Sequence, residues 1–396
     1  MRVAYICADA GVPVFGVKGS SRHVQEVIRA FLQNGSQVDL YASRIGGGVP
    51  RGLEPVTLKA LTPPPKGDVL QREVAELAAN RELRRALEKD GPYDMVYERY
   101  SLWSYAGMAY ARSIGAPGVL EVNAPLIEEQ EKYRTLVRRA HAERVARRAF
   151  RSASALLAVS HQVASHVKSY GDGVSGIHVI PNGVDTERFR PDMVPAHPYA
   201  PDEFVIGFAG SLKPWHGLEV LMEAFDQTVR HHPSSRLLIV GDGPGYTELE
   251  SEIERRGLEK TVRLIGQVAH DAVPHWLTAM DLAVAPYPAI EGFYFSPLKV
   301  FEYMAAGLPV VASDLGQISE VVEDRVSGLL VDPGDPGKLA SAFDLLIRKP
   351  ELRIRLGTAA RRKVAADHSW QAIARRVFSL AGVKPRASLV CEDLVL

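Results

Sequence analysis

The sequence has few cysteines, no excess of charge of either sign and no long apolar run. Its two cysteines, Cys7 and Cys391, cannot build a disulfide framework, and neither belongs to a Cys-x-x-Cys pair. The 47 basic residues equal the 47 acidic residues, which excludes a protein-wide electrostatic footprint for nucleic acid. No apolar run approaches the roughly 18 residues of a membrane span, and the apolar start is too short for a signal-peptide core. We therefore expect a cytoplasmic protein.

What the sequence contains is typical of parallel α/β domains. Hydrophobic residues make up 46% and charged residues 24% of the 396 residues, and the length allows two to three domains at about 150 residues each. Short apolar runs alternate with longer helical stretches. The expected strands form two sets, residues 2–8, 37–42, 94–98, 119–122, 155–159 and 177–180, then 204–209, 236–240, 262–265, 282–285, 309–312 and 328–331. Each set has the length of one doubly wound domain.

A polar, proline-rich segment at residues 186–203 separates the two sets and predicts a linker, with the boundary near residue 195. We expect an N-terminal domain of residues 1–190 and a C-terminal domain of residues 196–369. A last helix of about residues 370–385 follows the final strand, and we expect it to pack back on the N-terminal domain.

Loops that follow the strands of a parallel sheet are the expected ligand sites, because helix N-termini there present free backbone N–H groups. The loop after the first strand contains Gly16 and Gly19, which let the backbone approach an anion closely. The loop matches neither the dinucleotide fingerprint nor the Walker A pattern. A glycine turn without a ligand is the alternative for this loop.

The first loop of the second domain, Gly210–Gly217, leads from a strand into a helix. It contains Lys213 and His216, which bring one fixed and one conditional positive charge to that helix start. Such an arrangement suits a diphosphate. Two solvated basic residues in a turn are the alternative.

A later segment of the second domain is more specific for an anion. Ser296 is expected to cap a helix that begins at Pro297, which leaves the N–H groups of Leu298 and Lys299 free. Glu302 follows about one turn later. A buried carboxylate there would need a cation or hydroxyl groups such as those of a ribose, and an exposed helix carboxylate is the alternative.

Residues 131–151 are expected to form one helix that contains seven arginines. Such a helix could lie on an anionic membrane surface. A solvated helix whose arginines pair with neighbouring carboxylates is the alternative.

Four segments, in chain order, resemble the family-four retaining glycosyltransferases of GT-B fold: Gly19–Val24, Ile180–Asp185, Gly241–Pro244 and Phe301–Ser313. The resemblance covers nearly the whole chain. It implies two Rossmann-like domains that face a cleft, with a nucleotide-sugar donor on the second domain and the acceptor on the first.

The resemblance also implies roles for individual residues. Glu302 would bind the ribose hydroxyls, the N–H groups of Leu298 and Lys299 would hold the diphosphate, and the loop Gly16 to Gly19 would close over the phosphates. We expect catalytic roles for Lys213, Lys299 and Asn123, further donor contacts from His216, Ser296 and Val268, and an acceptor contact from Lys18.

The chain departs from the family pattern at several positions. Ser211 and His216 stand where many members have an Arg and a Lys. Tyr294 stands where many have the first of two glutamates. Asn123 stands where a His often follows the strand; Asn can bind a sugar hydroxyl but cannot act as a base.

We therefore expect a retaining glycosyltransferase that moves a hexose-type sugar from a UDP- or GDP-sugar to an acceptor hydroxyl. No Asp-x-Asp sequence occurs, so we expect no metal, and we expect no other cofactor and no nucleic-acid partner. The protein would be a monomer or homodimer, with weak contact to the inner face of the membrane as an additional expectation. A nucleotide-sugar 2-epimerase of the same fold and a non-catalytic nucleotide-binding relative are the alternatives; a dehydrogenase is disfavoured because the dinucleotide loop is missing.

Overall fold

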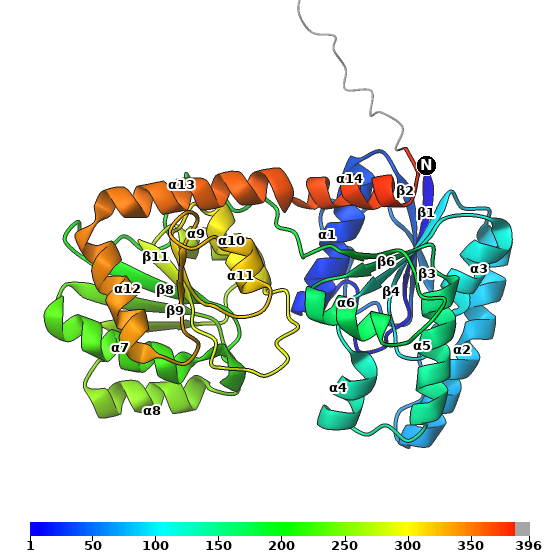
Figure 1. Ribbon diagram of the computed structural model, residues 1–396, viewed down its shortest axis with the longest axis horizontal. Coiled ribbons are helices and arrows are strands. Elements are labelled where there is room, and N and C mark those ends of the chain that lie inside the picture. The colour runs from blue at the N-terminus through cyan, green and yellow to red at the C-terminus, as the bar shows by residue number, and fades with distance from the viewer. Residues whose placement is uncertain (385–396) are drawn as a thin grey trace, which may run out of the picture. The chain divides into compact units, whose positions relative to one another are not determined.

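The computed structural model describes residues 1–384, which fold as two compact units (Figure 1). The first unit holds residues 1–181 and 370–384, and the second unit holds Asn182–Ser369. The chain thus changes unit ahead of the proline-rich segment near residue 195. Cys7 is buried as a free thiol, whereas Cys391 lies outside the described residues.

The first unit contains a sheet of 7 parallel strands in the order β3-β2-β1-β4-β5-β6-β7. Six of them match predicted runs. The sequence did not predict β3, because its four residues lie at the sheet edge, partly or fully exposed, and form no apolar run. The strands are β1 (Arg2–Cys7), β2 (Gln37–Ala42), β3 (Thr57–Ala60), β4 (Met95–Arg99), β5 (Gly118–Val122), β6 (Ala155–Ala158) and β7 (Ile177–Val179).

Helices cover this sheet, and the last helix of the chain is one of them. The Phe378 and Phe31 rings pack 5.0 Å apart between their centroids, and Trp370 meets His23 edge-on at 5.2 Å, so α14 packs against α1. The helix ends at Leu380 instead of near residue 385. The helices are α1 (Gly19–Gln33), α2 (Val69–Asp90), α3 (Ala106–Ile114), α4 (Leu126–Tyr133), α5 (Arg139–Ser152), α6 (His161–Lys168) and α14 (Trp370–Leu380).

The arginine-rich segment is two helices, not one. Helix α4 ends at Tyr133 and α5 begins at Arg139. The buried Glu73 carboxylate on α2 accepts hydrogen bonds from the backbone N–H groups of Val137 and Arg138 at 2.9 and 3.0 Å, which holds the start of α5. The apolar residues of α5 are buried within the unit, so this face of the helix serves the core.

The second unit contains a sheet of 6 parallel strands in the order β10-β9-β8-β11-β12-β13, and all six were predicted. The strands are β8 (Phe204–Ala209), β9 (Ser235–Val240), β10 (Val262–Gly266), β11 (Leu282–Ala285), β12 (Val310–Ser313) and β13 (Leu329–Val331). The α-helices are α7 (Leu218–His231), α8 (Tyr246–Arg256), α9 (Val273–Leu277), α10 (Leu298–Ala305), α11 (Ile318–Val321), α12 (Pro336–Arg348) and α13 (Pro350–Asp367). No helix within residues 1–384 is long and apolar enough to cross a membrane.

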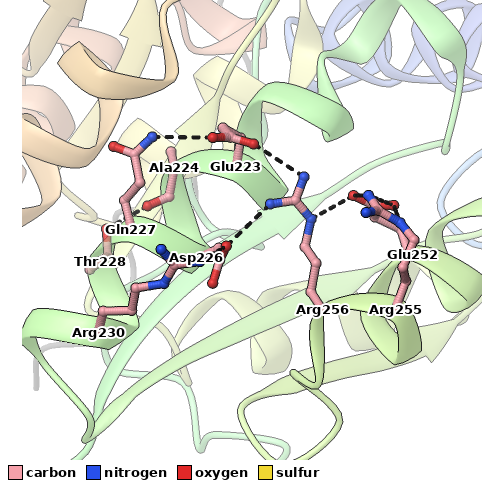
Figure 2. A network of polar contacts seen from close by, with 9 residues as sticks. All are labelled: Glu223, Ala224, Asp226, Gln227, Thr228, Arg230, Glu252, Arg255 and Arg256. Atoms are coloured by element: carbon pink, nitrogen blue, oxygen red, sulfur yellow. Dashed lines mark hydrogen bonds and ion pairs between the residues drawn. The ribbon is translucent and has the colours of Figure 1, made fainter.

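Figure 2 shows how α8 is fixed to α7. The Arg256 guanidinium on α8 reaches Glu223 and Asp226 on α7 at 3.2 and 3.4 Å, and also bonds Glu252 on its own helix. The Arg256 side chain is 17% exposed, so these ion pairs are less screened than pairs in open solvent. The network holds α8, which begins just after the loop that follows β9.

Candidate functional site

Lys299 lies in the first turn of α10, and its ammonium group is enclosed by the second unit. Its Nζ lies 4.3 Å from the centroid of the Phe208 ring and 5.4 Å from that of Tyr287. A Cβ on Gly210 would stand 2.9 Å from this Nζ, so a larger residue there would crowd it. Lys299 is buried, and among residues 1–384 its Nζ has no hydrogen-bond partner. Burial lowers the pKa of Lys299 to about 7, although the Glu302 carboxylate acts in the opposite direction.

His216 lies beside Lys299, in the short 3-10 helix η1 (Pro214–His216). Its Nδ1–H donates to the Ser211 carbonyl, which leaves Nε2 as a hydrogen-bond acceptor. Burial, together with the charges of Lys299 and Lys213, lowers the pKa of His216 to about 4. The ring is therefore neutral at pH 7, so the conditional positive charge of His216 is not present at that pH.

The structure thus brings Lys213, His216 and Lys299 together at the carboxyl ends of β8 and β11. The partly exposed Lys213 has its Nζ 5.8 Å from the centroid of the Trp215 ring. Its ammonium is the solvent-facing charge of the group, whereas that of Lys299 is the buried one.

The start of α10 is held by a contact that the sequence did not predict. The helix begins at Leu298 with Pro297 at its N-cap and without a side-chain cap, so the prediction that Ser296 caps it is wrong. The Ser296 Oγ instead accepts a hydrogen bond from the backbone N–H of Asn182 at 3.0 Å, and Asn182 Nδ2 donates to the Ser296 carbonyl at 2.7 Å. The Pro-Asn-Gly segment therefore positions the residues before the helix, whose first N–H groups have no partner within the helix.

Glu302 and Val268 take different positions in the second unit. Glu302 follows Lys299 by one turn of α10, is half-buried, and acts electrostatically on the Lys299 ammonium. Val268 lies beyond β10 at the sheet edge, and its side chain is partly buried against the apolar core.

The loops around Lys299 are locked together by close backbone approaches. A Cβ on Gly241 would stand 1.9 Å from the Gly210 carbonyl oxygen, and a Cβ on Gly217 would stand 1.6 Å from that of Pro286. Gly217 also has a φ of +71°, which L side chains rarely adopt. The loops after β8, β9 and β11 are thereby fixed against one another.

In the first unit, Lys18 and the two predicted glycines lie just before or at the start of α1. Lys18 is exposed and forms the N-cap, and Gly19 is the first helical residue. The buried Gln25 donates from Nε2 to the carbonyl oxygens of Val14 and Gly16, both at 2.9 Å, and so anchors the loop to the helix.

Asn123 follows β5 directly, and its Oδ1 is buried without a hydrogen-bond partner in the described part of the chain. Two residues earlier, the buried Glu121 carboxylate accepts a hydrogen bond from His23 Nε2 at 2.6 Å. Burial by itself would raise the pKa of Glu121, but His23 and Arg99 lower it overall. Glu121 is therefore engaged in the core, and Asn123 is the polar group that the strand presents at its end.

Four residues that position the candidate site were not predicted to do so. Phe208 and Tyr287 resemble ordinary core residues in the sequence, and only the pairing of β8 with β11 brings them to Lys299. Asn182 belongs to the segment Ile180–Asp185, for which the family resemblance implied no role. Gln25 gave no signal, because its two acceptors are backbone carbonyls.

Comparisons with known proteins agree with this architecture. Residues 17–188 match the family model described as Glycosyltransferase Family 4, and residues 203–349 match that described as Glycosyl transferases group 1. D-inositol 3-phosphate glycosyltransferase 1 of Catenulispora acidiphila is 28% identical over 390 residues, which cover 91% of this chain and 90% of the relative. D-inositol 3-phosphate glycosyltransferase of Corynebacterium jeikeium is 32% identical over 241 residues, which cover 57% of this chain and 56% of the relative.

Solved structures share the fold. Sucrose-phosphate synthase from Thermosynechococcus elongatus superposes with a TM-score of 0.73 at 21% identity, covering 96% of this chain and 98% of the other. Anabaena HepE in complex with UDP superposes with a TM-score of 0.71 at 21% identity, covering 96% of this chain and 100% of the other.

Two parallel-sheet α/β domains are the architecture that this chain shares with these solved structures, and it is that of the GT-B fold. The family models match both domains in the expected order. The chain belongs to the family-four glycosyltransferases.

Proposed function

We propose that the protein is a retaining glycosyltransferase that moves a hexose-type sugar from a UDP- or GDP-sugar to an acceptor hydroxyl without a metal ion. One observation carries the proposal: the buried amine of Lys299, which has no hydrogen-bond partner among residues 1–384, lies at the start of α10, one turn before Glu302. An anion is the ligand that such a group needs. The UDP complex of Anabaena HepE, which has the same fold, supports a nucleoside diphosphate as that anion.

The donor would lie along α10. Its diphosphate would contact Lys299, Lys213 and the N–H groups at the helix start around Leu298, and its ribose hydroxyls would bond the Glu302 carboxylate. The remaining donor contacts would come from Ser296, from Val268 near the nucleotide base, and from Gly16 and Gly19 of the first unit. His216 would accept a hydrogen bond through Nε2 instead of contributing charge.

In the proposed reaction, the bond between the anomeric carbon and the diphosphate oxygen breaks, and the acceptor oxygen attacks from the same face. The departing phosphate oxygen takes the acceptor's proton, so no protein base is required. Lys213 and Lys299 stabilise the charge that develops on the diphosphate. Asn123 would hold a sugar hydroxyl, and Lys18 would contact the acceptor.

Metal independence is part of the proposal. The groups around Lys299 are cationic and aromatic, and no three His, Cys, Asp or Glu side chains in residues 1–384 group as metal ligands. Turnover should therefore persist in excess EDTA, and loss of activity that Mg²⁺ or Mn²⁺ restores would contradict this point.

The test of the function is transfer from UDP- and GDP-sugars to a panel of hydroxyl acceptors, with the anomeric configuration of the product followed by NMR. Retention is expected, and consistent inversion would refute the assignment. Lys299→Ala should lower turnover more than donor affinity, because the diphosphate gains charge in the transition state; the exposed Lys260→Ala is the matched control. An epimerised donor without acceptor would indicate a 2-epimerase, and binding without turnover a non-catalytic relative.

We also propose cytoplasmic residence, with weak contact to the inner face of an anionic membrane. Tyr133 and Val137, which are 68% and 52% exposed, flank the exposed Arg134 in the connection between α4 and α5 and support such contact. Sedimentation with anionic vesicles but not with neutral ones is expected. Equal recovery with both vesicle types would refute this contact.

A further inference from the structure

The surroundings of the Lys299 amine are unusual for a charged group. Its Nζ lies over the rings of Phe208 and Tyr287, and it fills the space that a Cβ on Gly210 would need, all inside the second unit. Cation–π contacts of this kind supply only part of what a fully desolvated ammonium loses on leaving water. The amine is therefore placed where its charge is costly until an anion arrives.

The neighbouring titratable groups do not compensate for this cost. From the loop after β8, a neutral His216 lies near the amine, and Lys213 lies near His216; from the loop after β11, Tyr287 presents its ring. On α10 itself, Glu302 is the carboxylate that favours the charged amine, and it lies one turn away. Glu302 thus offsets only part of the cost of burial, which disfavours the charged form of the amine.

We propose that binding of the donor is coupled to the uptake of one proton by Lys299. At pH 8 the amine of the free enzyme is mostly neutral; it takes a proton from the solvent as the diphosphate enters and loses it when the nucleoside diphosphate leaves. This inference rests on the proposed function, because it takes the diphosphate as the anion at α10. It goes beyond that function because it states that at pH 8 Lys299 becomes positively charged when the donor binds.

The proton balance sets the pH dependence. Burial places the pKa of Lys299 near 7, so the amine is mostly neutral at pH 8, whereas the pKa of His216 is too low for it to take the proton. A diphosphate beside the amine favours the ammonium form and raises its pKa. Donor affinity should therefore fall by up to tenfold for each pH unit above about 8, until the pKa of the complex is reached.

The arrangement also explains why Lys299 would serve catalysis more than binding. Part of its attraction to the ground-state diphosphate is offset by the cost of protonating a buried amine. The additional negative charge of the departing diphosphate carries no second such cost, since the proton is already bound. The lysine thus stabilises the leaving group without holding the donor too tightly.

The experiment is isothermal titration calorimetry of the whole enzyme with UDP and with GDP at pH 8, in buffers of different ionisation enthalpy. At this pH the nucleotide phosphate is itself ionised, since its last pKa lies near 6. The slope of binding enthalpy against buffer enthalpy should report uptake of close to one proton. At pH 6 the amine is already protonated, so its contribution to the uptake should fall towards zero, and the nucleotide phosphate can itself release protons on binding.

Variants assign the proton to this residue. Lys299→Arg, whose side chain stays charged, should bind without proton uptake, and Lys299→Met should bind at least tenfold more weakly and also without uptake. Lys213→Met should retain the uptake. Retained uptake in Lys299→Arg would overturn the assignment, and the pH dependence of the unmodified enzyme tests the proposal even if the variants fail to fold.

The two proposals fail in different ways. If UDP or GDP binds with no proton uptake at pH 8, the coupling is refuted and the donor site stands. If neither nucleotide binds, and ADP and dTDP do not bind either, the proposed function is refuted and the coupling falls with it.

Discussion

Replacing Lys299 by methionine should stabilise the free enzyme. The Lys299 side chain is buried and its end lies over two aromatic rings, so a methionine of similar length fits the same space. What the substitution removes is a buried amine with no hydrogen-bond partner among the described residues. Function and stability are therefore expected to oppose each other at this position.

The magnitude follows from the pKa of the lysine. Burial lowers this pKa from 10.5 to about 7, and each pKa unit corresponds to about 1.4 kcal/mol. The full cost of the buried charge is therefore about 5 kcal/mol. Residual structure in the unfolded chain and the loss of the cation–π contacts reduce the benefit of removing it, so we expect the free energy of unfolding to rise by about 2–4 kcal/mol at pH 6.

The lowered pKa of Lys299 also determines how the stability difference between the two proteins changes with pH. Because the folded-state pKa is depressed, the unfolded chain binds more protons between about pH 7 and 10.5, and the stability of the unmodified enzyme rises across this window. The advantage of Lys299→Met is therefore largest below pH 7. It should shrink by about 1.4 kcal/mol for each pH unit from 7 to 9.

Urea unfolding of both proteins at pH 6, 7.5 and 9, followed by circular dichroism and tryptophan fluorescence, measures the difference. The exposed Lys260→Met is the control, and its effect should stay within about 0.5 kcal/mol at every pH. Loss of stability in Lys299→Met would refute the reasoning, since it would mean that the ammonium is well solvated or paired. A gain that is identical at pH 6 and 9 would show that the amine does not titrate in this range.

The remaining predictions concern other contacts. Glu302→Gln should weaken UDP or GDP binding by about 1–3 kcal/mol in calorimetry, because an amide accepts ribose hydroxyls less well; unchanged affinity would contradict the assignment. Glu73→Ala should lower the free energy of unfolding by about 1–3 kcal/mol, because two partly buried N–H groups at the start of α5 lose their acceptor, and Glu73→Gln should cost less. Equal stability of all three proteins would contradict this role. Gly217→Ala should lower the free energy of unfolding by more than the roughly 1–2 kcal/mol that a positive φ alone costs, because the new Cβ would collide with Pro286. Gly257→Ala is the control: Gly257 has a φ of +66° and open space around its Cβ, so it should show only the cost of the positive φ. Similar losses of thermal stability in the two variants would argue against the contact with Pro286.

The fold was predictable because its strands are buried on both faces. Such strands, β8 and β11 among them, appear in the sequence as continuous apolar runs, and the intervening helices have their own periodicity. The edge strand β3 escaped prediction because it is partly exposed and has no such run. The prediction of one helix over residues 131–151 was wrong because helix-forming residues continue through the segment without a break signal. The break at residues 134–138 depends on a partner from another helix, the Glu73 carboxylate of α2.

The candidate site was predictable in part. Lys213, His216 and Lys299 stand in loops that follow strands or at a helix start, where parallel sheets collect ligands, so position alone indicated them. The capping role of Ser296 was wrong, because its hydroxyl is taken by Asn182, 114 residues earlier in the chain. No local pattern reports a partner at that distance.

The sequence by itself determined two α/β domains, the loops that carry the candidate site, and the family. Its zero net charge showed only that any bound anion is held locally. The tertiary structure decided how that local charge is distributed: His216 is neutral, Lys213 is partly exposed, and Lys299 is enclosed by aromatic rings. The physical reason is that a side chain's charge depends on its loss of water and on its neighbours, and the neighbours of Lys299 come from β8 and β11, which only folding brings to its helix.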